Sequence, residues 1–261
     1  MSPFVLEIKF ISDMIIVVLI KWRYRVKKFL RKILFSFLLV IAVCVAVAIY
    51  QGNKLYKNCL EEEPLREKID AIIAEKQNYV KYDDINEDYI NAVISVEDVR
   101  FFKHKGVDII SICRAIFVDI KNMNFTEGGS TITQQLAKNI YFNQKKEITR
   151  KIAEIFVAKD IENNYSKEEI FELYVNTIYY GDGYYSLYDA SKGYFGKEPK
   201  EMNLYEETLL AGIPNAPSVY SPTVNPELSK QRQKQVIHKM EKNNFITKEI
   251  ADDLCKQIDQ K

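Results

Sequence analysis

The chain has 261 residues, a length that suits one sizeable domain with additional segments. Charged residues make up 28% of it, yet the net charge is only +1. This balance argues against a general nucleic-acid binder, so any binding of anions must come from a local group of cations.

Positive charge gathers near the N-terminus, directly before an apolar run. Residues 21–32 hold seven lysines and arginines, and Ile33–Tyr50 is apolar except for Ser36. As a helix, the 18 residues of this run rise about 27 Å, close to the thickness of a bilayer core. Basic residues before a span predict that the N-terminus is cytoplasmic. We therefore expect a cytoplasmic segment 1–32 and one transmembrane helix 33–50, with the rest on the outer face of the cell membrane.

A cleaved signal peptide is the competing interpretation of this segment. The apolar run is long for the core of a signal peptide, and Tyr50-Gln51-Gly52-Asn53 is a poor cleavage site. Both observations favour an uncleaved membrane anchor.

The rest of the chain divides into a polar stalk (51–78), a globular domain (79–226) and a helical C-terminal tail (227–261). We find no internal repeat, and the apolar periodicity is that of a mainly α protein. It predicts two helices in the tail and helices over 87–101, 107–120, 131–139, 146–163, 167–176, 185–193 and 204–212.

Glu97 is the first candidate site residue. It falls on the same helical stripe as Ile90, Val93 and Ile94, the face expected to be buried. A carboxylate that faces a core or cleft loses water and is suited to act as a general acid or base. The alternative is a glutamate at a helix end that turns out to solvent. The neighbouring Asp98 points to another side and would cap or orient.

His104 and Gly106 follow this helix. His104 is one of only two histidines and has no metal partner at a suitable spacing, so by itself it is most simply a hydrogen-bonded structural residue. Gly106 would end the helix.

Gly128 and Gly129 run straight into a segment rich in hydroxyls and amides. Ser130 is a good N-cap, so the helix would begin there. A helix N-terminus after two glycines presents free N–H groups to an anion. The structural alternative is a loop that caps a helix.

A later helix carries a strip of charge. Lys146, Arg150 and Glu154 are spaced by four residues and share one face, with Lys151 beside it. This strip is either a surface with weak i,i+4 ion pairs or a cationic site for a phosphate group, which together with Lys138 would suit a diphosphate. The face expected to be buried consists of Ile148, Ile152, Ile155 and Phe156.

Five blocks in order resemble glycosyltransferase family 51, the peptidoglycan glycosyltransferases. The absence of a C-terminal penicillin-binding domain makes the chain similar to the monofunctional biosynthetic transglycosylases. The blocks are 97–106 (Glu-Asp-Val-Arg-Phe-Phe-Lys-His-Lys-Gly), 128–139 (Gly-Gly-Ser-Thr-Ile-Thr-Gln-Gln-Leu-Ala-Lys-Asn), 150–154 (Arg-Lys-Ile-Ala-Glu), 167–176 (Lys-Glu-Glu-Ile-Phe-Glu-Leu-Tyr-Val-Asn) and 181–218, which includes Ala-Gly-Ile-Pro-Asn-Ala-Pro.

The resemblance implies a lysozyme-like glycosyltransferase domain in two lobes, with the smaller lobe against membrane lipid. The donor would be a glycan linked to undecaprenyl diphosphate and the acceptor lipid II. The reaction implied is polymerisation of lipid II into β-1,4-linked strands, with inversion and release of undecaprenyl diphosphate. Other cell-wall synthesis proteins stay open as partners.

The same resemblance assigns roles to residues. Glu97 would be the general base, and Glu154 a second carboxylate with an orienting or electrostatic role. A divalent cation, Mg²⁺ or Mn²⁺, at the diphosphate is left open. The residues expected to neutralise the diphosphate are Lys138, Lys146, Arg150 and Lys151. The other residues expected in the substrate site are Ser130, Thr131, Gln134, Gln135, Asp98 and His104.

The chain departs from the family pattern at two places. Ala153 stands where the third motif usually has a second lysine, and Lys145-Lys146 where an arginine is usual. Lysine keeps charge but loses bidentate geometry, so we expect weaker diphosphate binding. Both carboxylates are intact, so we expect activity. The alternatives are a catalytically silent membrane-anchored scaffold and a glycan-cleaving, muramidase-like enzyme.

Overall fold

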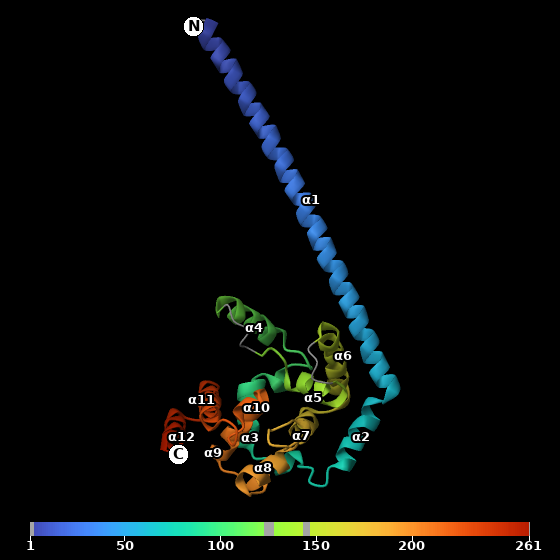
Figure 1. Cartoon of the computed structure of the whole chain (residues 1–261), viewed down its shortest axis with the longest axis vertical. Coiled ribbons are helices and arrows are strands. Elements are labelled where there is room, and N and C mark those ends of the chain that lie inside the picture. Colours follow the sequence, from blue (N-terminus) through green and yellow to red (C-terminus); the bar gives the residue numbers. More distant parts are fainter. Residues whose placement is uncertain (1–2, 123–127, 143–146, 261) are drawn as a thin grey trace. The chain divides into compact units, whose positions relative to one another are not determined.

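The computed structural model describes residues 3–122, 128–142 and 147–260, and within these ranges every regular element is a helix, with no strand (Figure 1). The prediction of a mainly α protein is therefore confirmed. The α-helices are α1 (Pro3–Glu62), α2 (Leu65–Glu75), α3 (Glu87–Glu97), α4 (Ile109–Asn122), α5 (Ile132–Tyr141), α6 (Ile148–Asn164), α7 (Lys167–Thr177), α8 (Leu187–Phe195), α9 (Leu204–Gly212), α10 (Pro217–Tyr220), α11 (Pro226–Lys242) and α12 (Lys248–Gln260). Short 3₁₀ helices are η1 (Tyr82–Asp84), η2 (Phe101–Lys103), η3 (Pro199–Glu201) and η4 (Ile213–Asn215).

Helix α1 runs without a break through the basic segment, the apolar run and the first part of the predicted stalk. In the described part of the chain it is the one helix long and apolar enough to cross a membrane. It is therefore a candidate membrane anchor, while its ends at 33 and 50 and the side of its N-terminus stay predictions. The chain divides into two compact units, residues 1–51 and 52–261.

Helix α3 ends earlier than the periodicity predicts. It stops at Glu97, because Asp98 takes a non-helical backbone with φ −157° and ψ 73°. Phe101 lies within the predicted helix 87–101 and is fully buried, but it begins the separate helix η2. Gly106 therefore does not end α3. Its φ of +87° turns the following loop so closely against α6 that a Cβ atom there would lie 3.0 Å from the carbonyl oxygen of Ala158.

Helix α5 begins one residue later than predicted. Thr131, not Ser130, is the N-cap, and its hydroxyl accepts a hydrogen bond from the backbone N–H of Gln134. The Gln134 side chain accepts one from the backbone N–H of Thr131, which completes a capping box. A threonine three residues before a glutamine satisfies two N–H groups, whereas Ser130 has no glutamine or glutamate at that spacing.

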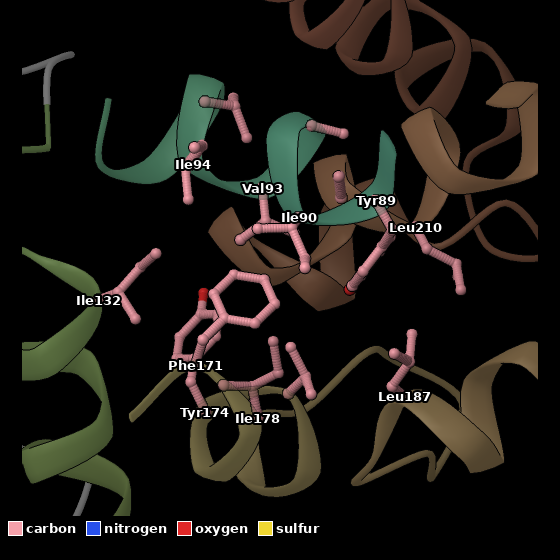
Figure 2. Packing of buried hydrophobic residues seen from close by; sticks show 14 of the residues in the cluster. Tyr89, Ile90, Val93, Ile94, Ile132, Phe171, Tyr174, Ile178, Leu187 and Leu210 are labelled. Atoms are coloured by element: carbon pink, nitrogen blue, oxygen red, sulfur yellow. The ribbon is translucent and has the colours of Figure 1, made fainter. Parts of the chain in front are cut away.

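The buried face of α3 forms part of the hydrophobic core (Figure 2). Its side chains Ile90 and Val93 point toward Phe171 and Tyr174 of α7, and all four are buried. Burying such large apolar side chains contributes about 1.5–3 kcal/mol each, so this packing fixes where the end of α3 lies.

The predicted buried face of α6 is wrong, because none of its four residues is buried. Ile148 is 76% exposed at the helix start, and Ile152 is only half-buried. The fully buried positions include Ala153 and Glu154, since the helix turns that side toward α5. The charged strip is therefore partly inside the protein.

Two groups of helices frame the domain. Helix α5 packs against α6 and α7, while α3 packs against α9 and α11, with α12 on α11 (Figure 1). The tail is thus part of the domain, and the C-terminal end of α3 lies where it can meet side chains from both groups.

Candidate active site

The carboxylate of Glu97 closes helix α3 and is 6% exposed. Its Oε2 accepts a hydrogen bond from Gln135 Nε2 of α5 at 2.8 Å. Its Oε1 lies 3.4 Å from Nη2 of Arg232 of α11. Two helices that are distant in sequence therefore hold one carboxylate. Each oxygen keeps a further lone pair with which it can accept a proton.

Asp98 and His104 form a framework beside Glu97. Asp98 Oδ2 lies 2.8 Å from His104 Nε2 and accepts a hydrogen bond from the backbone N–H of Ile132 at 3.0 Å. The Gly106 N–H donates to His104 Nδ1 at 3.2 Å, so the neutral ring carries its proton on Nε2 and donates it to Asp98. Both side chains thereby tie the end of α3 to the start of α5.

Thr131 and Gln134 belong to the same framework. Both are buried, and their polar side-chain atoms are engaged in the capping box. The Thr131 hydroxyl also donates to the carbonyl oxygen of Gly106 at 2.6 Å. The structure thus gives these two residues, like Asp98 and His104, protein partners, and their contact with substrate stays a prediction.

Glu154 is the centre of the charged strip and is 1% exposed. It accepts a hydrogen bond from Arg150 Nη1 at 2.5 Å and from Lys151 Nζ at 2.9 Å. Lys151 Nζ also donates to Ser130 Oγ at 2.7 Å, which joins the glycine loop to α6. Arg150 Nε is buried and has no hydrogen-bond partner in the described part of the chain. A carboxylate this deeply set among cations is more than a weak surface pair.

Lys138 of α5 is a further cation near the charged strip, and it has no partner among the described residues. Burial lowers the pKa of Lys138, and the nearby Arg150 and Lys151 cations lower it further, while Glu154 and Glu97 oppose this. No hydrogen bond or ion pair to Lys138 is found among the described residues. Both Glu154 and Glu97 act on the pKa of Lys138, which indicates that the two carboxylates lie near the same lysine.

Lys146, the remaining predicted cation, lies outside the described residues. Among those that are described, no group of three or more His, Cys, Asp or Glu side chains could hold a metal ion. Glu97 and Glu154 already accept hydrogen bonds from cations. The described residues therefore do not fit a divalent cation held by protein ligands.

Arg232 is the residue of this site that the sequence analysis missed. It lies in the tail, beyond the last of the five blocks. The signal that could have found it is a lone arginine on the apolar side of α11, close to the buried Val236 and Met240.

The arrangement joins a proton acceptor to a set of cations. A buried carboxylate with fixed orientation can take a proton from a hydroxyl, and cations nearby can stabilise negative charge on a leaving group. This combination suits transfer of a group from an anionic leaving group to a hydroxyl.

Comparison with known proteins agrees with this chemistry. The family model described as transglycosylase matches residues 65–241, a span that includes Arg232. The chain is 44% identical over 183 residues to penicillin-binding protein 2D of Bacillus subtilis, which covers 70% of this chain and 26% of that protein. It is 42% identical over 186 residues to penicillin-binding protein 1A of Neisseria lactamica, covering 71% and 23%.

The chain spans about a quarter of the length of these curated relatives. A crystal structure of penicillin-binding protein 1A from Haemophilus influenzae matches 69% of this chain and 17% of that one, with 23% identity and a TM-score of 0.42, a similarity too weak to bear on the fold. The similarity to monofunctional enzymes stays a prediction. Because the family model covers more than half of the chain, the chain belongs to the transglycosylase family, glycosyltransferase family 51.

Proposed function

We propose that the protein is a membrane-anchored peptidoglycan glycosyltransferase that polymerises lipid II into β-1,4-linked glycan strands and releases undecaprenyl diphosphate. Family membership supports the class of reaction. The observation that carries the proposal is Lys138, a cation without a hydrogen-bond or ion-pair partner among the described residues, within electrostatic range of both Glu97 and Glu154.

Glu97 acts as the general base in this proposal. It removes the proton from the 4-hydroxyl of the acceptor sugar, and that oxygen attacks the anomeric carbon of the donor. The new C–O bond forms as the bond from the anomeric carbon to the diphosphate oxygen breaks. The proton ends on Glu97, the electron pair leaves with the diphosphate, and a single displacement inverts the anomeric centre.

The cations act on the leaving group. A diphosphate needs neutralisation of its charge more than it needs a proton. Lys138 supplies an ammonium and the buried Nε of Arg150 supplies a donor, and neither group has a partner in the described part of the chain. Glu154 fixes the positions of Arg150 and Lys151 by accepting from both. The divalent cation stays a proposal for the diphosphate oxygens and takes part in none of these steps.

The substrate is lipid-linked, so the site must open near a membrane. Helix α4 exposes the apolar side chains of Ile109, Ile110 and Phe117, which suit contact with lipid. We propose that α4 belongs to the smaller lobe and faces the outer leaflet, with the N-terminus of α1 in the cytoplasm.

Polymerisation of labelled lipid II by the detergent-solubilised chain tests the proposal. We expect polymer from the wild type and a loss of roughly 10²- to 10⁴-fold in Glu97→Gln, the range for removal of a general base. The amide keeps the size of the side chain. Glu87→Gln is the matched control, since Glu87 is exposed at the other end of the same helix.

Two other results would overturn the proposal. A wild type that binds undecaprenyl diphosphate but forms no polymer would favour the silent scaffold. Release of lipid-free fragments from preformed glycan, without polymer, would favour a muramidase-like enzyme.

A further inference from the structure

We propose that Arg232, from the C-terminal tail, is a positioning residue that holds the carboxylate of Glu97 in the orientation needed to accept the proton. The inference rests on the proposed function, since it concerns the same site. It gives the tail a role in the reaction besides packing.

Arg232 is fixed through each of its nitrogens. Nη2 lies 3.4 Å from Glu97 Oε1, Nε donates to the carbonyl oxygen of Gly212 at 3.2 Å, and Nη1 donates to Gln235 Oε1 at 3.1 Å. The guanidinium also lies over the ring of Tyr220, 5.6 Å from its centroid. A planar group with contacts on three edges and one face has little freedom to turn, so it can set the orientation of its partner.

The neighbouring helix leaves room for this side chain. A Cβ atom at Gly212 would lie 3.0 Å from Cγ of Arg232, so a larger residue at the end of α9 would push the arginine aside. Helix α11 makes a second contact with the end of α3, where Lys239 Nζ donates to the carbonyl oxygen of Val96 at 3.4 Å. The arginine thus reaches Glu97 from a helix that is itself attached to α3.

Two donors on different helices share the carboxylate. The terminal torsion of a glutamate is broad, so one hydrogen bond leaves the plane of the carboxylate poorly defined. Gln135 holds Oε2 from α5, and Arg232 holds Oε1 from α11. The longer 3.4 Å contact is of the kind that tightens when substrate completes a site.

Both charged side chains of the pair are nearly removed from water. The exposed fraction is 9% for Arg232 and 6% for Glu97. Loss of the arginine would leave Glu97 with Gln135 as its one donor among the described residues. The carboxylate would then be free to turn, and proton transfer depends on its geometry within a fraction of an ångström.

The test compares Arg232→Met, Arg232→Lys and the control Gln233→Leu. Gln233 is buried one position along α11 and donates to the carbonyl oxygen of Tyr205 and to Thr208 Oγ1 of α9, so its loss weakens the packing of the tail without touching Glu97. Measurements are kcat and KM for lipid II polymerisation, binding of undecaprenyl diphosphate, and the melting temperature.

We expect kcat of Arg232→Met to fall about 10-fold or more, with KM and binding of undecaprenyl diphosphate within about 3-fold of wild type. Arg232→Lys should recover part of kcat, because the ammonium keeps charge but lacks the fork. Gln233→Leu should lower the melting temperature and keep kcat.

Equal kcat in Arg232→Met and Gln233→Leu would overturn the inference, and so would parallel losses of kcat and product binding. If Arg232→Met does not fold, Arg232→Lys decides in the same way, since an unchanged kcat in that variant contradicts the orienting role. A wild type without polymer would instead contradict the proposed function, so the two failures are distinct.

Discussion

At the scale of single residues, Lys138 offers the sharpest test of the cationic site. Arg150 and Lys151 pair with Glu154, whereas Lys138 has no hydrogen-bond or ion-pair partner among the described residues. We expect Lys138→Met to lose about 10²-fold in kcat/KM and to bind undecaprenyl diphosphate more weakly, because a charge-assisted contact is lost. Lys159→Met, an exposed lysine on α6, is the control that should behave as wild type.

The pH dependence gives this prediction a second readout. Burial lowers the pKa of Lys138, so its charge is lost at a lower pH than that of an ordinary lysine. Binding of the diphosphate should therefore weaken as the pH rises through that range, and kcat/KM, which reports the free enzyme, should fall with it. Lys138→Arg, which stays charged, should move this alkaline limb to higher pH. An identical limb in both proteins would contradict the assignment.

The contacts of the charged strip that spacing can predict have one property in common, which is that both partners lie within about one turn of the same helix. Arg150 and Glu154 form the i,i+4 pair that their spacing predicts, and Lys151 joins them. Arg232 could not be found in this way, because its contact with Glu97 joins residues 135 positions apart in the sequence. Such a contact exists only once α11 has packed on α3.

At the scale of elements, the end of α1 packs against α6, the helix that carries the charged strip. Tyr56 donates to Asp160 Oδ2 at 2.5 Å, and its ring lies 5.5 Å from that of Phe156. Burial raises the pKa of Tyr56 to about 12. A Cβ atom at Gly52 would lie 2.5 Å from Cγ2 of Ile152, so glycine sets how closely the two helices approach.

Gly52→Val should therefore push α1 away from α6 and disturb the charged strip on its other face. Overpacking of this kind costs about 1–3 kcal/mol, which corresponds to a fall of roughly 2–4 °C in melting temperature per kcal/mol for a domain of this size. Lipid II polymerisation should fall with it. Lys54→Val places the same side chain on the exposed side of α1 and should change neither quantity. A normal melting temperature for Gly52→Val would show that the helices do not need this close approach.

The periodicity located most helices because their apolar positions recur at helical spacing, and the limits of α7 and α9 agree with the prediction to within a residue. It was wrong where backbone conformation decided the outcome. Helix α3 ends where the backbone of Asp98 leaves the helical conformation. The capping box makes Thr131, and not Ser130, the N-cap of α5. Neither outcome depends on hydrophobicity, so the periodicity could not give them.

At the scale of the whole molecule, Glu207 connects α9 to the start of α3. It is buried in α9, and its Oε1 accepts a hydrogen bond from Asn86 Nδ2 at 2.7 Å, at the N-cap of α3. Helix α3 ends with Glu97. The packing of α9 against the start of α3 therefore also helps to fix the position of Glu97 at the end of α3. The pKa of Glu207 is raised to about 7, mainly by burial and to a smaller extent by the Asp88 and Glu206 charges, while the Asn86 hydrogen bond opposes this.

The direction of the resulting pH dependence follows from the two pKa values. Between the ordinary pKa of 4.5 and about 7, folded Glu207 holds a proton that the unfolded chain has released. Its contribution to stability is therefore present below about pH 4.5 and is lost as the pH rises through about 7. We expect a loss of about 1–2 kcal/mol, less than the full conversion of about 1.4 kcal/mol per pKa unit because solvent screens part of it.

Glu207→Gln removes this dependence while its amide oxygen can still accept from Asn86. The melting temperature of the variant minus that of the wild type should therefore grow from about pH 5 to about pH 8 in one detergent. Glu87→Gln, which changes an exposed glutamate, should show no such trend. Because α3 carries both Asn86 and Glu97, the polymerisation rate of the wild type should be more sensitive to heat at the higher pH than that of Glu207→Gln. A difference in melting temperature that stays constant or shrinks with pH would mean that Glu207 is ionised in the folded protein throughout this range.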